Sequence, residues 1–129
     1  MVDEMITQED IDAFKEMQEE NMTFSDYQTQ AGKTAIYSDA DTIVYCLMGL
    51  CSEVGELAGK YKKLLRDSNG HITPEFRADM AAELGDVQWY VSNLATDLGY
   101  GLEKIAQMNL NKLNSRLARG VIGGSGDNR

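Results

Sequence analysis

Two short acidic segments, Ser52-Glu53-Val54-Gly55-Glu56 and Glu83-Leu84-Gly85-Asp86, decide how this chain is interpreted. In each segment two carboxylates stand three residues apart, which on an α-helix places both on one face. An apolar stripe of helical spacing runs beside each pair, displaced from it in the same rotational sense. If the stripes pack together, the four carboxylates converge at the edge of the core. The stripes are Ile43, Leu47, Leu50, Val54, Leu57, Tyr61 and Leu64, and Met80, Leu84, Val87, Val91, Leu94 and Leu98.

The composition predicts one all-α domain over residues 1–129. The chain has a single proline, no alternating β-branched runs and many strong helix formers. Capping residues and turn clusters divide it into N-terminal helices within about 8–32, two long carboxylate-bearing helices, a shorter last helix and a glycine-rich tail. The expected fold is therefore a helical bundle with a core of about 38–118. The expected helices are about 8–20, 25–32, 38–66, 74–98 and 102–118, and the tail is 120–129.

Charge and hydropathy exclude several classes of partner. A net charge of −9 argues against binding to duplex nucleic acid, which needs a basic face. No apolar run approaches the roughly 18 residues that span a bilayer, and the acidic N-terminus lacks a signal-peptide pattern. Cys46 and Cys51 lie five residues apart on one expected helix, too far for a disulfide, so both are read as reduced, mostly packed thiols. A cytoplasmic protein with no membrane contact is expected.

The acidic pairs suit a hard divalent cation. A single E-x-x-E is common on solvated helices, but two pairs at matching angles beside apolar stripes are less easily accidental. An oxygen-only ligand set favours Mg²⁺, with Mn²⁺ as a substitute, over zinc. The one histidine, His71, falls in a turn cluster and is read as an exposed loop residue.

Surface features of the two long helices indicate self-association. Trp89 falls on the face opposite the apolar stripe, where it either lies in a subunit interface or stacks on a nucleotide base. Gly55 and Gly59 give the first acidic helix a small-residue flank that another helix can approach closely. These features predict a homo-oligomer, either a dimer or a tetramer.

The basic residues of the last helix and of the first acidic helix can each be interpreted in two ways. Asn109, Lys112 and Arg116 share one edge of the last helix. In one interpretation, Asn109 is a core asparagine and the two basic side chains are solvated. In the other, these side chains contact phosphate. Lys60 lies on the carboxylate side of its helix. It either contacts phosphate or pairs with Glu56 one turn earlier.

The segments around the acidic pairs resemble a known family. Gly49-Leu50-Cys51-Ser52-Glu53-Val54-Gly55-Glu56-Leu57 and Ala82-Glu83-Leu84-Gly85-Asp86-Val87 are similar to the MazG-like, all-α nucleoside triphosphate pyrophosphohydrolases. Asn109-x-x-Lys112-Leu113-x-x-Arg116 and Arg119-Gly120 resemble the C-terminal helix of that family. The likeness covers about residues 40–120, and the ending Gly-Ser-Gly-Asp-Asn-Arg looks like that of its small members.

The resemblance implies an Mg²⁺-dependent enzyme that cleaves a (d)NTP between the α- and β-phosphates, releasing (d)NMP and pyrophosphate through metal-activated water. Ser52 stands where many members carry a further Glu, so Glu53 or Glu56 is expected to take the catalytic role. The metal ligands implied are Glu53, Glu56, Glu83 and Asp86, and the substrate-binding residues expected are Asn93, Asn109, Lys112, Arg116, Lys60, Trp89 and Tyr90.

Two alternatives stay open at the level of sequence. The chain can be a catalytically weak helical interaction or regulatory module whose acidic face binds a basic partner. It can also be an enzyme like phosphoribosyl-ATP pyrophosphohydrolase, which shares the carboxylate helices. The products formed from a panel of nucleotides separate these possibilities.

Overall fold

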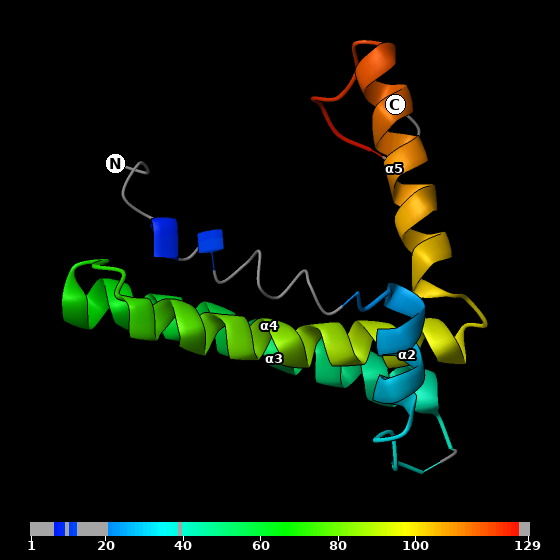
Figure 1. Cartoon of the computed structure of the whole chain (residues 1–129), viewed down its shortest axis with the longest axis horizontal. Helices are drawn as coiled ribbons and strands as arrows, with labels where there is room; N and C mark the ends of the chain where they lie inside the picture. Colours follow the sequence, from blue (N-terminus) through cyan, green and yellow to red (C-terminus); the bar gives the residue numbers. More distant parts are fainter. Residues whose placement is uncertain (1–6, 10, 13–20, 39, 127–129) are drawn as a thin grey trace.

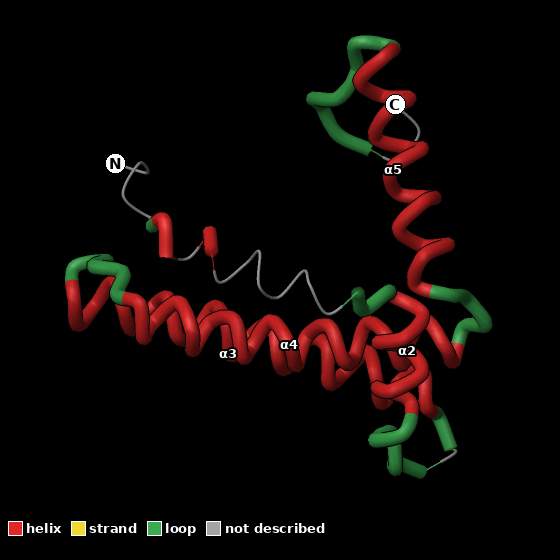
Figure 2. The backbone as a smooth tube through the Cα atoms, viewed as in Figure 1, coloured by secondary structure: helices red, strands yellow, loops and turns green. Residues whose placement is uncertain are grey.

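The computed structural model describes residues 7–9, 11–12, 21–38 and 40–126. From residue 21 on, the described part of the chain forms four helices: α2 (Phe24–Gly32), α3 (Thr42–Ser68), α4 (Pro74–Asp97) and α5 (Leu102–Ala118). The described residues contain no strand, so the all-α prediction is confirmed (Figures 1 and 2). Most of the first expected helix, about residues 8–20, lies outside the described residues.

Local capping chemistry sets the starts of α2 and α4. Thr73 Oγ1 accepts a hydrogen bond from Phe76 N at 3.1 Å, and Pro74 occupies the first helical position, as expected for the start of α4. At α2 the cap is Thr23, in a capping box with Asp26, and the expected cap Ser25 instead donates to Glu103 of α5. The α5 boundaries agree with the prediction.

The helices α3 and α4 form a long antiparallel pair, joined by the turn at 69–73 (Figure 1). Asn69 and Gly70 both have left-handed backbone angles there, which reverse the chain after α3. The pair buries less of its apolar stripes than expected. Leu64 is buried and Val87 is half-buried, but many stripe residues stay exposed in the single chain: Ile43, Leu47, Val54, Tyr61, Leu84 and Leu98.

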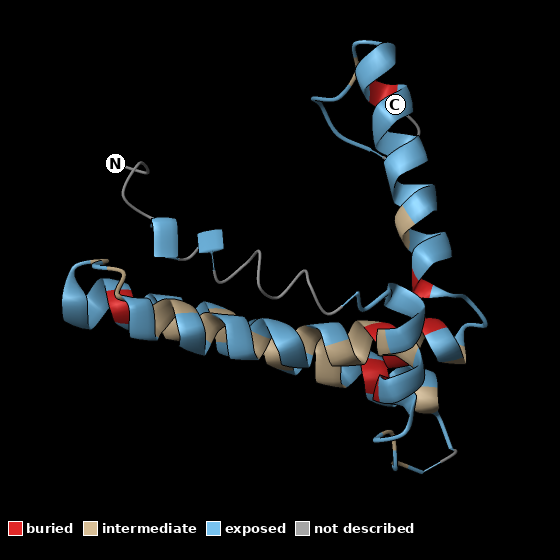
Figure 3. Ribbon diagram, viewed as in Figure 1, coloured by how far each residue is buried: buried red, intermediate tan, exposed pale blue. Residues whose placement is uncertain are grey.

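The core lies where α2 crosses the α3–α4 pair, and Figure 3 shows most of the buried residues gathered there. Gln28 holds this junction together with three hydrogen bonds. Its Nε2 donates to Thr96 Oγ1 at 3.0 Å and to Tyr100 O at 2.9 Å, while its Oε1 accepts from Leu102 N at 2.9 Å. These bonds tie α2 to the end of α4 and to the start of α5. The buried apolar residues near the junction are Ala31, Cys46, Ala95 and Leu102.

The two cysteines differ in their surroundings. Both are free thiols, as predicted, and Cys46 is fully buried beside Tyr37 and Asp97. Burial, the largest cause, raises the pKa of Cys46. Cys51 is exposed, so its predicted packing is wrong in the single chain.

The helix α3 is long and apolar enough to cross a membrane when length and composition alone are considered. The expectation that no segment reaches this threshold is therefore wrong. One such helix is weak evidence of a membrane span, because the mostly buried core helix of a soluble protein and a signal sequence pass the same test. In this chain α3 also carries Glu53 and Lys60, whose side chains face partners on α4.

Candidate active site

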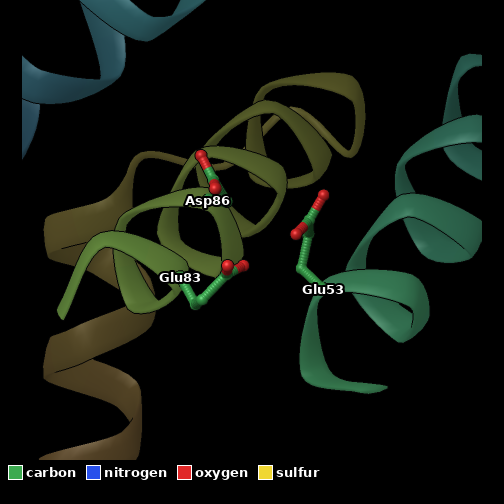
Figure 4. A group of neighbouring side chains, drawn as sticks. All are labelled: Glu53, Glu83 and Asp86. Atoms are coloured by element: carbon green, nitrogen blue, oxygen red, sulfur yellow. The ribbon is translucent and has the colours of Figure 1, made fainter. Parts of the chain in front are cut away.

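Three carboxylates from the two long helices meet at one point. Glu53 of α3 and Glu83 and Asp86 of α4 each offer an oxygen within 4.8 Å of the other two. Figure 4 shows the three side chains pointing toward one another across the helix pair. The i, i+3 spacing of Glu83 and Asp86 on α4 places both opposite Glu53, as the pattern predicted.

The expected fourth ligand does not join this group. Glu56 is exposed, and its carboxylate lies outside the set formed by the other three. The prediction of four converging carboxylates is corrected to three. Glu56 stays close enough for its charge to act on Glu53.

Glu53 is the carboxylate of the cluster whose negative charge is disfavoured by its surroundings. Partial burial, followed by the charges of Asp86, Glu83 and Glu56, raises the pKa of Glu53 above its usual value. The charged form of Glu53 is thus disfavoured in the metal-free protein. A divalent cation held by these carboxylates would offset this repulsion.

Lys60 bridges the helices on one side of the cluster. Its Nζ lies 2.6 Å from Asp79 Oδ1 and 2.8 Å from Glu83 Oε1, both on α4. Hydrogen bonds to Asp79 and Glu83 raise the pKa of Lys60 to about 12. These contacts differ from the simple pairing with Glu56 that was one reading of the sequence.

An aromatic cluster adjoins the carboxylates. Tyr37 and Tyr45 stack with ring centroids 4.5 Å apart, Trp89 meets Tyr90 edge-on at 5.0 Å, and Tyr45 lies 6.4 Å from Tyr90. Tyr90 follows Asp86 by one turn of α4, on the same face of the helix. Burial, then Tyr45 and the charge of Glu53, raise the pKa of Tyr90. The described chain therefore offers flat apolar surfaces next to a candidate cation site.

Trp89 is half-buried and packs against its own chain. Its Nε1 donates to Thr34 Oγ1 at 2.7 Å, and its ring meets Tyr37 edge-on at 6.3 Å. The prediction that Trp89 points away from the rest of the chain is wrong, because the segment that links α2 to α3 covers it. Trp89 therefore gives no argument for a subunit interface.

The other expected substrate residues lie elsewhere. Asn93 is only 2 % exposed, and its Nδ2 donates to Trp89 O at 3.1 Å within α4. Arg116 is 4 % exposed, and its Nη2 donates to Gly126 O at 3.5 Å, so the tail folds back against it. Asn109 and Lys112 line a separate groove of about 420 Å³ with Leu98 and Ile105.

The position of α5 explains this separation. It packs chiefly against α2 and projects away from the α3–α4 pair (Figure 1). Asn109 and Lys112 are consequently not brought to the carboxylates of their own chain.

The three carboxylates fit a small hard cation. Ligands at the 2.0–2.1 Å typical of Mg²⁺ are at most about 4.2 Å apart across the ion. A small inward movement of the side chains, from separations within 4.8 Å, brings their oxygens into that range. With no nitrogen or sulfur in the group, Glu53, Glu83 and Asp86 suit Mg²⁺ or Mn²⁺.

Two neighbours of the site were not singled out from sequence. Tyr27 belongs to α2, which packs on α4, and burial, followed by the charge of Asp86, raises the pKa of Tyr27. Gly49 lies directly under the Tyr90 ring, because a Cβ built on Gly49 would be 2.1 Å from Tyr90 Cε1. The spacing Gly49 to Glu53, one turn, matches that of Tyr90 to Asp86, and this match is the only sequence signal for the contact.

Comparison with known proteins places the chain in a family. The model of the MazG nucleotide pyrophosphohydrolase domain matches residues 42–120, which include α3, α4 and α5. The chain belongs to the MazG nucleotide pyrophosphohydrolase family. It is also similar to the Gene 37 protein of Mycobacterium phage L5, with 56 % identity over 109 residues that cover 80 % of this chain and 96 % of the phage protein. No solved structure matches.

Proposed function

We propose that this protein is a Mg²⁺-dependent nucleoside triphosphate pyrophosphohydrolase that acts in the cytoplasm. The convergence of Glu53, Glu83 and Asp86, in a chain of this family, is the observation that carries the proposal. Water attacks the α-phosphorus, the bond from that phosphorus to the bridging oxygen breaks, and the products are the (d)NMP and pyrophosphate.

Each residue has a task in this reaction. Glu53, Glu83 and Asp86 hold the cation, which, when bound, neutralises phosphate charge and polarises the attacking water. Glu56 is exposed near Glu53 and outside the ligand set, so its carboxylate is suited to accept the proton that the water loses. Tyr90, one turn after Asp86 on α4, offers a ring on which a base can stack.

A nucleotide panel tests the reaction. With Mg²⁺, we expect monophosphate plus pyrophosphate from at least one standard or modified (d)NTP, and no activity in EDTA. Release of diphosphate plus phosphate would contradict the proposed bond cleavage. A preference for phosphoribosyl-ATP would favour the related biosynthetic enzyme, and inactivity on the whole panel would favour the interaction module.

We further propose a homo-oligomer in which α5 of one chain serves the site of another. The exposed apolar residues of α3 and α4, and the groove between the end of α4 and α5 that Leu98 and Ile105 line, leave more apolar surface open than a monomer usually tolerates. Because α5 lies apart from its own carboxylates, Asn109 and Lys112 can contact phosphate only if another chain provides them. The proposed active site is therefore shared between subunits.

Subunit mixing tests this arrangement. Glu53→Gln and Lys112→Gln should each inactivate the enzyme when alone. After co-refolding in equal amounts, a dimer with shared sites should regain about a quarter of wild-type activity, because half of the dimers are mixed and each holds one intact site. No recovery in mixed oligomers would show that each chain builds its own site, and sedimentation as a 14.3 kDa monomer would exclude sharing altogether.

A further inference from the structure

Lys60 links the two long helices beside the proposed metal site. It is on α3 one turn after Glu56, yet its ammonium contacts two carboxylates of α4, Asp79 and Glu83, at 2.6 and 2.8 Å. The Lys60 and Glu83 side chains are only 25 % and 17 % exposed. The contact is thus partly shielded from water and adjoins the proposed metal site.

Glu83 belongs to two groups at once. One of its oxygens takes part in the cluster with Glu53 and Asp86, and its Oε1 accepts from Lys60. Asp79 lies one helical turn before Glu83 on the same face of α4. Without an ammonium between them, Asp79 and Glu83 would form a second oxygen-only pair that shares Glu83 with the first cluster.

A shared carboxylate of this kind is how two-metal sites hold ions about 3.5–4 Å apart. The Lys60 ammonium already occupies the space between Asp79 and Glu83, and it neutralises one of their charges. It also fixes the Glu83 side chain by a hydrogen bond, so that its carboxylate is held for the first ion.

We propose that Lys60 is a tethered cation that limits the carboxylate site to one divalent ion per chain in the absence of nucleotide. The inference rests on the proposed function, because it assumes that Glu53, Glu83 and Asp86 bind a metal. Lys60 acts here as a positioning residue, through Glu83, and contacts neither the water nor the scissile bond.

The experiment measures the number of Mn²⁺ ions bound per chain, by titration followed with electron paramagnetic resonance, on the full chain without nucleotide. The wild type should bind one ion. Lys60→Met keeps the apolar stem but removes the charge, and should bind two. Lys63→Met is the matched control, since Lys63 is an exposed lysine of the same helix that lines the same groove as Lys60, and this variant should bind one.

A second substitution assigns the extra ion to its ligands. Lys60→Met with Asp79→Asn should return to one ion, because the second pair then lacks a carboxylate. Lys60→Arg, which keeps a cation, should also bind one. Melting curves in EDTA verify that each variant is folded.

The outcomes separate the inference from the function on which it rests. A wild type that binds two ions, or a folded Lys60→Met that still binds one, overturns the role given to Lys60 and leaves the metal site standing. A wild type that binds no Mn²⁺ overturns the metal site itself, and the inference with it.

Discussion

Replacing Glu53 by glutamine is expected to raise the melting temperature of the metal-free protein by a few degrees, while abolishing the further rise that Mg²⁺ produces in the wild type. The amide keeps the shape of the side chain and removes the charge that Asp86, Glu83 and Glu56 repel. Mg²⁺ stabilises a protein to which it binds only in the folded state, and this variant lacks one of the three ligands. Hydrolysis should fall at least about a hundredfold.

The raised pKa of Glu53 also predicts how the stability of the metal-free protein depends on pH. Because folding raises the pKa of Glu53, the folded state binds more protons than the unfolded chain between the two pKa values. The contribution of Glu53 to stability is thus complete below its unfolded pKa and is lost as the pH rises through the folded one. Melting curves in EDTA across that range should show the wild type losing this contribution and Glu53→Gln not losing it.

Glu83→Gln is the matched comparison for Glu53→Gln. It also removes one charge from the cluster, but Glu83 accepts from Lys60 at 2.8 Å, so the substitution weakens a favourable pair. It should not raise the melting temperature in EDTA, although it too should lose the Mg²⁺ response. If both variants melt below the wild type in EDTA and still respond fully to Mg²⁺, the carboxylates are structural and the proposed metal site is wrong.

The helices were predictable because their signals are local. Thr73-Pro74 at the start of α4 and the turn after α3 act within a few residues, and the structure has the boundaries close to where these signals place them. Ser25 shows the limit of such reasoning. The Ser25 hydroxyl donates a hydrogen bond to Glu103, 78 residues away, and Thr23 caps α2 instead.

The carboxylate cluster was predictable only in part, for a geometric reason. Spacing fixes which side chains share a face of one helix, but the rotation and stagger of two packed helices decide which of them meet. Glu53 meets the α4 pair, whereas Glu56, one turn on, is exposed. The same uncertainty hid the contacts of Lys60, which depend on Asp79 of the neighbouring helix.

Long-range packing explains the other differences between the structure and the predictions made from the sequence. Nothing in the periodicity of α5 shows that Gln28 anchors its start and that it projects from the helix pair. Likewise, the covering of Trp89 by Thr34 depends on the path of a loop. These features come from contacts between residues that are far apart in sequence.

Replacing Gly49 by alanine should destabilise the protein, although alanine is the better helix former. At a solvated helical position this change stabilises by about 1 kcal/mol. Here the new Cβ would be 2.1 Å from Tyr90 Cε1 and 2.3 Å from Tyr90 Cζ, so the ring must move. Trp89 and Tyr45 pack beside that ring, and overpacking of this kind costs about 1–3 kcal/mol. We expect a fall in melting temperature and weaker nucleotide binding, because the displaced ring borders the carboxylates.

Two comparisons identify the cause of that loss. Gly85→Ala on α4 meets no atom within 4 Å in its own chain and should stabilise the fold. In a Tyr90→Ala background, where the ring is absent, Gly49→Ala should change sign and become stabilising, which a double-mutant cycle measures as coupling between the two positions. If Gly49→Ala lowers the melting temperature equally with and without the Tyr90 ring, the two residues are uncoupled. The close packing of α3 under Tyr90 would then not be what requires glycine at this position.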